Sequence, residues 1–91
     1  MINLSIIIPI GRHENDFKLI KQIKQKFKGC EIILVVDEGN KLINQKKIEV
    51  DQLYLLRNSS RASALNKGIN LSTRDILWLL HLDSDIKNIS P

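Results

Sequence analysis

Two aspartates separated by one residue, Asp83 and Asp85, form the most chemically suggestive pair in the sequence. In an extended chain, residues two apart point to the same side, so both carboxylates can reach one hard cation. His81 lies on that side as well if the extended run continues. Carboxylate oxygens suit Mg²⁺ or Mn²⁺, whereas Zn²⁺ favours nitrogen and sulfur ligands. The pair therefore predicts a divalent metal site, and the alternative is a polar turn that caps the following segment.

A third carboxylate, Asp37, directly follows an apolar run. At the end of a buried strand it can accept hydrogen bonds from a nucleobase imide or a ribose hydroxyl. The alternative is an Asx turn that leads into Gly39, and both interpretations stay open on the sequence alone. Arg57 and Arg61 flank a short polar stretch, and either guanidinium can hold a phosphate group in a bidentate manner.

The familiar phosphate-binding motifs are absent from the sequence. Gly11 follows the first apolar run without the second and third glycines of a dinucleotide fingerprint, and no glycine-rich loop ends in Lys and Ser or Thr. This pattern disfavours classical NAD binding and P-loop ATP hydrolysis. A phosphate group would instead be met by a divalent metal and by arginine or lysine side chains.

Short apolar runs alternate with polar stretches of helical spacing, and this alternation is typical of βα units around a parallel sheet. The expected strands are Leu4–Ile10, Glu31–Asp37, about Gln52–Leu56 and about Asp75–Leu82. The first two runs lack polar alternation, which predicts central strands buried on both faces. The third run is more mixed and is expected nearer an edge.

Two helices are expected between these strands. They cover Glu14–Lys28 and about Ser60–Leu71, with one or two further helical turns within Lys41–Ile48. Gly29 suits the end of the first helix, and a serine at the start of the second is its expected N-cap, either Ser59 or Ser60. The predicted fold is a Rossmann-like three-layer α/β sandwich with a mostly parallel four-stranded sheet.

The chain has 91 residues and a mass of 10.5 kDa, which predicts a single small domain. In open α/β sheets, ligands bind beyond the carboxyl ends of the strands. Asp37, Arg57, Arg61 and Asp83 all follow predicted strands, so the sheet is expected to bring them to a common rim.

The net charge of +4 suits a nucleic acid, an anionic membrane or a phosphate-bearing ligand. Five lysines lie on the first predicted helix: Lys18, Lys21, Lys24, Lys26 and Lys28. Without interleaved arginine or aromatic residues they are interpreted as a solvated helix face, so no nucleic-acid partner is expected.

No targeting or membrane segment is expected. The apolar run Leu4–Ile10 is too short to span a bilayer and lacks the flanks of a signal peptide. Cys30 is the only cysteine, so no intramolecular disulfide can form, which fits a reducing cytoplasm. Association with a membrane surface is compatible with the charge but is not indicated by any motif.

Four blocks of the sequence together resemble family 2 glycosyltransferases with the GT-A fold. The blocks are LSIIIP at residues 4–9, EIILVVDEGN at 31–40, RASALNKG at 61–68 and LLHLDSD at 79–85. They occur in the order found in that family and cover nearly the whole chain. The resemblance implies that residues 1–91 are a nucleotide-sugar-binding half domain, a truncated GT-A fold with strand order 3-2-1-4.

The resemblance also implies roles for individual residues. Asp37 matches the family carboxylate that contacts the base, usually uracil. Asp83 and Asp85 match the Asp-x-Asp motif, whose last residue commonly holds Mn²⁺ or Mg²⁺ on the diphosphate and whose first contacts ribose or metal. Pro9 matches the loop that lines the nucleoside, and Arg61 matches a position that often lies near the nucleotide.

The implied activity is transfer of a sugar from a nucleotide-diphosphate sugar, more often UDP-linked, to an acceptor hydroxyl. Such a transfer needs a carboxylate base when it inverts the sugar, and in the family this base lies with the acceptor site in a second half. No residue of this sequence is assigned that role, so whether the chain is itself an enzyme stays open. The alternative is a non-catalytic α/β binding or assembly module.

In the order 3-2-1-4 the fourth strand is an edge, and its apolar residues 76–80 predict a homo-oligomer in which another copy covers it.

Overall fold

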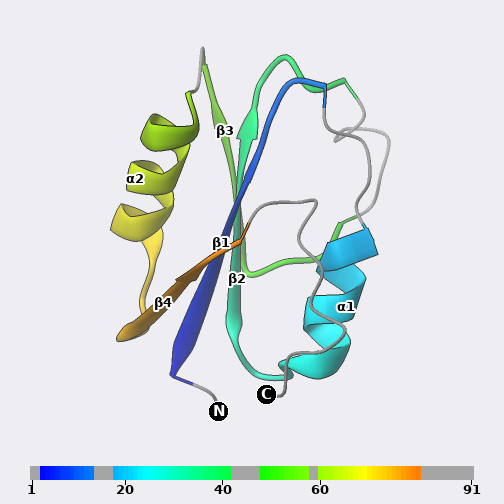
Figure 1. Ribbon diagram of the computed structural model, residues 1–91, viewed down its shortest axis with the longest axis vertical. Helices are drawn as coiled ribbons and strands as arrows, with labels where there is room; N and C mark the ends of the chain where they lie inside the picture. The colour runs from blue at the N-terminus through cyan, green and yellow to red at the C-terminus, as the bar shows by residue number, and fades with distance from the viewer. Residues whose placement is uncertain (1–2, 14–17, 42–47, 58–59, 81–91) are drawn as a thin grey trace.

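The computed structural model describes residues 3–13, 18–41, 48–57 and 60–80 of the chain. Its elements are β1 (Leu4–Ile10), α1 (Lys18–Lys26), β2 (Glu31–Asp37), β3 (Gln52–Leu56), α2 (Arg61–Leu71) and β4 (Ile76–Leu79). The four strands form one parallel sheet in the order β3-β2-β1-β4. Figure 1 shows α1 on one side of this sheet and α2 on the other. The predicted α/β class, the three layers and the strand order are therefore confirmed.

The two central strands, β1 and β2, are buried along almost their whole length. They pair in register, with Ile6 beside Ile32 and Ile8 beside Leu34. Because side chains alternate across a strand, Ile6 and Ile8 join the core on the α1 side while Ile7 joins the core on the α2 side. Both faces are covered, which explains why these runs are continuously apolar.

The helix α1 packs on the sheet through Leu19, Ile20 and Ile23. Phe27 follows the helix, and its ring meets Trp78 of β4 edge to face, with ring centroids 5.3 Å apart. Gly29 has a φ of 90°, a conformation that glycine adopts without strain just beyond a helix end. The predicted helix Glu14–Lys28 is confirmed over residues 18–26 and ends two residues earlier than predicted; residues 14–17 lie outside the described part.

A reciprocal pair of hydrogen bonds starts α2. The Ser60 hydroxyl accepts from the Ser63 N–H at 3.1 Å, and the Ser63 hydroxyl accepts from the Ser60 N–H at 2.9 Å. This arrangement is a capping box, and it identifies Ser60 as the N-cap. The helix then runs to Leu71, as predicted.

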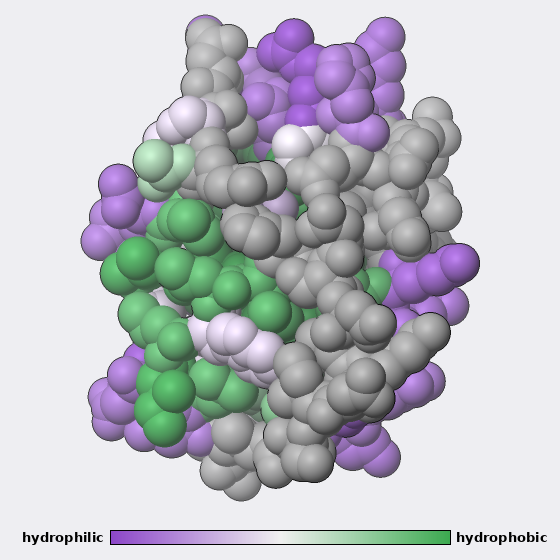
Figure 2. Space-filling view, viewed as in Figure 1, coloured by the Kyte–Doolittle hydropathy of each residue, from purple (hydrophilic) through white to green (hydrophobic). Residues whose placement is uncertain are grey.

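Both edge strands are more exposed than the centre. The strand β3 has the predicted bounds and edge position, and Leu53 and Leu55 are exposed on it. The strand β4 runs from Ile76 to Leu79, so Asp75 and Leu80 of the predicted Asp75–Leu82 lie outside it, and residues 81–82 fall outside the described part. Figure 2 shows hydrophobic surface gathered over β4. The helical turns predicted within residues 41–48 fall mainly on residues 42–47, outside the described part.

Within the ranges that the structure describes, no helix is long and apolar enough to cross a bilayer.

Candidate functional site

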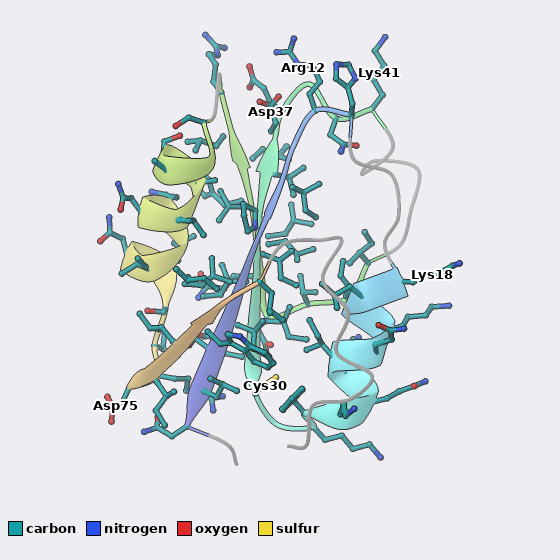
Figure 3. All side chains as sticks on the ribbon, viewed as in Figure 1. Arg12, Lys18, Cys30, Asp37, Lys41 and Asp75 are labelled. Carbon is teal, nitrogen blue, oxygen red and sulfur yellow. The ribbon has the colours of Figure 1, made fainter. Side chains whose placement is uncertain are left out.

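The carboxyl ends of β1 and β2 bring several polar groups to one rim of the sheet. Figure 3 shows Arg12, Asp37 and Lys41 together at this end, with Cys30 and Asp75 at the opposite end. The strand order reverses at β1, because β2 and β3 lie on one side of it and β4 on the other. Ligands of open α/β sheets bind beyond the carboxyl ends at such a reversal, so this rim is the candidate site.

Asp37 is the last residue of β2, and its side chain is only 8% exposed. Its Oδ1 accepts the Gly39 N–H at 2.8 Å, and its backbone carbonyl accepts the Asn40 N–H at 2.9 Å. The Asx turn considered from the sequence is therefore present. The turn fixes the orientation of the carboxylate at the rim, where it can still act as a hydrogen-bond acceptor for a ligand.

Arg12 lies against this turn. Its Nε is 3.6 Å from Asp37 Oδ1, and its side chain is 56% exposed. A Cβ built on Gly39 would come within 2.5 Å of Arg12 Nε and 3.0 Å of Asp37 Oδ1. The absence of a side chain at Gly39 thus lets the guanidinium lie over the turn. The sequence prediction missed Arg12 as a site residue, although its position just after a central strand was an available signal.

Asn40 joins the two loops of the site. Its side chain is almost fully buried, and Nδ2 donates to the Gly11 carbonyl at 2.8 Å. The loop after β1, which carries Arg12, is thereby tied to the turn after β2, which carries Asp37. The hydrogen bond of this buried side chain consequently helps to set the relative placement of the two charged groups.

A second ion pair lies on the same rim, farther from the core. Arg57 Nε donates to Glu38 Oε1 at 3.1 Å, and the two side chains are 80% and 45% exposed. The Glu38 N–H is held by the Leu56 carbonyl at 3.1 Å, which links the ends of β2 and β3. An exposed pair of this kind contributes little to stability.

The other predicted site residues are not among the described groups that the structure brings together at this rim. Pro9 is buried inside β1 and pairs in register with Val35, so it belongs to the strand and not to the following loop. Arg61 is the first residue of α2, and its side chain is not described. Asp83 and Asp85 lie outside the described residues, as does His81. The strand β4 ends at Leu79, and the Leu80 N–H still donates to the Ile7 carbonyl at 3.0 Å. The predicted position of Asp83, directly after the fourth strand, stays a prediction.

The described part of the chain holds no group of three or more His, Cys, Asp or Glu residues placed to bind a metal. The structure thus brings together Asp37 and Arg12, and the predicted metal ligands stay a prediction from sequence.

A buried polar cluster occupies the opposite end of the sheet. The Glu31 carboxylate accepts from the Ser5 hydroxyl at 2.7 Å, from the Thr73 N–H at 2.9 Å, from the Thr73 hydroxyl at 2.8 Å and from Gln52 Nε2 at 3.4 Å. Burial alone would raise the pKa of Glu31, but these hydrogen bonds outweigh it and hold the pKa below its ordinary value. All these partners belong to the fold itself, so the cluster is structural.

An open depression with a volume of about 430 Å³ lies at this same end, beside the last turn of α1. Its polar groups serve the fold: Lys24 Nζ donates to the Glu49 carbonyl at 2.7 Å, and Asp51 Oδ2 accepts the Ile32 N–H at 2.7 Å. Glu49 and Asp51 precede β3 and lie at the end of the sheet away from the candidate site.

Comparison with protein-family models, with curated proteins and with solved structures finds no match to this chain. Function is therefore inferred from the fold and from the chain's own residues.

Proposed function

We propose that this chain binds the nucleotide-sugar donor of a glycosyltransferase similar to family 2, with the nucleotide lying across the carboxyl ends of the strands. The observation that carries the proposal is the Asp37 carboxylate, buried and oriented by its turn at the rim where β1 and β2 end. The four ordered sequence blocks support the same assignment.

Asp37 is proposed to accept a hydrogen bond from the base. An ionised carboxylate forms short, strong hydrogen bonds with N–H donors. Because the Asx turn already fixes this side chain, binding loses little side-chain freedom. The rim also carries cationic groups, among them Arg12 and Arg57, that favour a ligand bearing a diphosphate.

Asp83 and Asp85 are proposed, from the sequence, to hold Mn²⁺ or Mg²⁺. When bound, such an ion neutralises the diphosphate leaving group of the donor. Arg61, at the start of α2, is proposed to contribute to the same end of the nucleotide. The proposed activity of this chain is donor binding, since no residue is assigned as the base that deprotonates an acceptor hydroxyl.

Calorimetric titration of the chain with UDP, UDP-sugars and GDP-mannose, with and without Mn²⁺, tests the proposal. We expect binding that strengthens with the metal and that weakens about tenfold or more in Asp37→Asn, a change that keeps a side-chain acceptor for the Gly39 N–H but removes the charge. Asp85→Ala is expected to abolish the metal effect. Glu49→Gln, at the opposite end of the sheet, is the matched control. An absence of binding at millimolar nucleotide with Mn²⁺ would contradict the proposal.

We also propose a second candidate function, assembly through β4. Ile76, Leu77 and Leu79 are 60%, 39% and 43% exposed on this edge strand, and Figure 2 shows the apolar surface that they help to form. A copy rotated by 180° about an axis perpendicular to the sheet would pair β4 with itself in antiparallel fashion, so the same apolar residues would meet.

Sedimentation measurements test this second candidate. We expect dimers at high protein concentration and monomers for Leu77→Lys. The control Leu53→Lys, at a residue of similar exposure on β3, should leave the dimer intact. Monomers alone at high concentration would contradict assembly through β4.

A further inference from the structure

We infer that Arg12 recognises the nucleobase together with Asp37, so that the site selects bases that present an N–H group beside a carbonyl. Uracil and guanine have such an edge, whereas cytosine and adenine do not. The inference rests on the proposed function, because it concerns the same nucleotide site, and it adds a specificity residue that the sequence resemblance did not supply.

The first observation is the separation of the two charged groups. Arg12 Nε and Asp37 Oδ1 are 3.6 Å apart, longer than the roughly 2.7–2.9 Å of a direct charge-assisted hydrogen bond. The groups therefore attract each other without forming a direct hydrogen bond. The rim offers a ligand one donor and one acceptor side by side, as a base edge with one donor and one acceptor requires.

The second observation is the difference in exposure. The Asp37 side chain is 8% exposed and the Arg12 side chain 56% exposed, so the guanidinium lies on the solvent side of the carboxylate. A base that hydrogen-bonds Asp37 on this side would lie within reach of the Arg12 guanidinium. An arginine offers a planar fork of five N–H donors, and a single contact through Nε leaves most of that fork available.

The third observation is the backbone that supports the pair. Asn40 holds the Gly11 carbonyl, one residue before Arg12, and Gly39 leaves the space in which the guanidinium lies. The backbone beneath both groups is thus fixed, while the long side chain of Arg12 can still adjust to a ligand. The Arg12 end of this ion pair is exposed and the charged atoms are 3.6 Å apart, so moving the guanidinium opposes binding little.

The chemistry of the base edges gives the expected selectivity. In uracil and guanine a ring N–H can donate to the Asp37 carboxylate while the adjacent carbonyl accepts from the Arg12 guanidinium. Cytosine and adenine present a ring-nitrogen lone pair at the corresponding position, which repels a carboxylate. A site that matches one base edge disfavours a base with the opposite pattern, because the carboxylate then faces a lone pair in place of a donor.

Neighbouring cations provide the comparison. Arg57 carries the same guanidinium at the same rim, but it donates to Glu38 at 3.1 Å and is 80% exposed. It contributes to the electrostatic attraction of a diphosphate from its place beside Glu38. Arg57→Met is therefore the matched control for Arg12→Met, since each change removes one rim charge and keeps an unbranched side chain.

The test is calorimetric titration of UDP and of CDP, in the presence of Mn²⁺, into the unchanged chain, Arg12→Met and Arg57→Met. UDP and CDP share the ribose and the diphosphate, so the ratio of their affinities isolates the base. We expect the unchanged chain to bind UDP about tenfold or more tightly than CDP, and the ratio to fall severalfold in Arg12→Met through weaker UDP binding, while Asp37 keeps the rest of the discrimination. Arg57→Met should weaken both nucleotides alike and keep the ratio.

The outcomes separate the two proposals. Binding of UDP by the unchanged chain with the same UDP-to-CDP ratio in Arg12→Met would overturn the role of Arg12 and leave the nucleotide site standing. Tighter UDP binding by Arg12→Met would also overturn it, because Arg12 would then be a competitor for Asp37. An absence of binding by either nucleotide to the unchanged chain would overturn the proposed function itself. The urea midpoint of each variant, measured alongside, shows that the variants compared are folded.

Discussion

Gly68 of α2 lies so close to Ile7 of β1 that a Cβ added to the glycine would come within 2.3 Å of Ile7 Cγ2. Both residues are buried. The helix therefore rests on the sheet at a point where it has no side chain of its own, and the isoleucine fills the space. This close contact limits how near α2 and β1 can approach each other.

Gly68→Ala is expected to destabilise the chain. Overpacking a tight core contact costs about 1–3 kcal/mol, which exceeds the gain of about 1 kcal/mol from replacing glycine inside a helix. Urea unfolding measures the change, and Asn66→Ala, at an exposed position of the same helix, is the control. In an Ile7→Ala background the cost should shrink, because the clashing methyl is gone. An equal cost in both backgrounds would contradict the contact as its cause.

The sequence predicted β1, β2 and the edge strand β3 to the residue, and the other edge strand, β4, less well. Continuous runs of branched apolar residues define β1 and β2, because only a strand covered on both faces has that pattern. The strand β4 was predicted too long, since a run of apolar residues does not reveal where pairing with a neighbour stops. Its start depends on Asn3, whose side chain exchanges two hydrogen bonds with Asp75, at 3.0 and 3.1 Å, across 72 positions of sequence.

The candidate site was also predicted only in part from the sequence. Asp37 was predicted because the end of a buried strand is visible in the sequence. The pairing with Arg12 and the hydrogen bonds of Glu31 were not, because they join residues brought together only by the completed sheet. Thr73, for example, lies 42 positions from the carboxylate that it binds. The pattern of residue types along a sequence does not show which residues, far apart in the chain, will form a hydrogen bond.

Glu31→Gln should reduce stability at neutral pH by about 2 kcal/mol, the scale of hydrogen bonds to a buried charged group. The folded-state pKa of Glu31 is lowered from its ordinary value of 4.5, so the ionised group stabilises the fold above that pH. This contribution is lost as the pH falls below 4.5 and through the folded-state pKa. Urea midpoints at neutral and acidic pH should therefore show a gap between the two proteins that narrows in acid. A constant gap would contradict the assignment, and Glu49→Gln is the control for stability at neutral pH.

Ser60→Ala removes the side chain that caps α2. The Ser63 N–H then loses its acceptor, and the reciprocal bond from the Ser60 N–H no longer closes a box. Loss of such a cap costs about 1 kcal/mol. Urea unfolding should show this decrease, while Asn70→Ala, on the same helix but away from its start, should not. Ser60→Asp keeps a side-chain acceptor and should retain most of the stability.

Cys30 is expected to react slowly with thiol reagents in the folded chain. It is 8% exposed, and burial, together with the negative charge of Asp51, raises the pKa of the thiol. The reactive thiolate is therefore scarce as well as shielded. Reaction with a chromogenic disulfide should be slower than in the urea-unfolded chain by about an order of magnitude or more. Equal rates in the two states would show that Cys30 is accessible.

Asn40→Ala should affect both stability and the candidate site. The change removes the 2.8 Å hydrogen bond to the Gly11 carbonyl, and a lost hydrogen bond of a buried side chain costs about 1 kcal/mol. Because Gly11 precedes Arg12, the loop that carries the guanidinium also loses its tie to the turn that carries Asp37. UDP binding should weaken more than unfolding alone explains, and Asn40→Asp should weaken it further, since a carboxylate there would face a carbonyl oxygen. The control for stability is Lys41→Ala, at the exposed neighbouring position. If the Asn40→Ala variant is less stable but binds UDP with normal affinity, this hydrogen bond supports the fold and not the site.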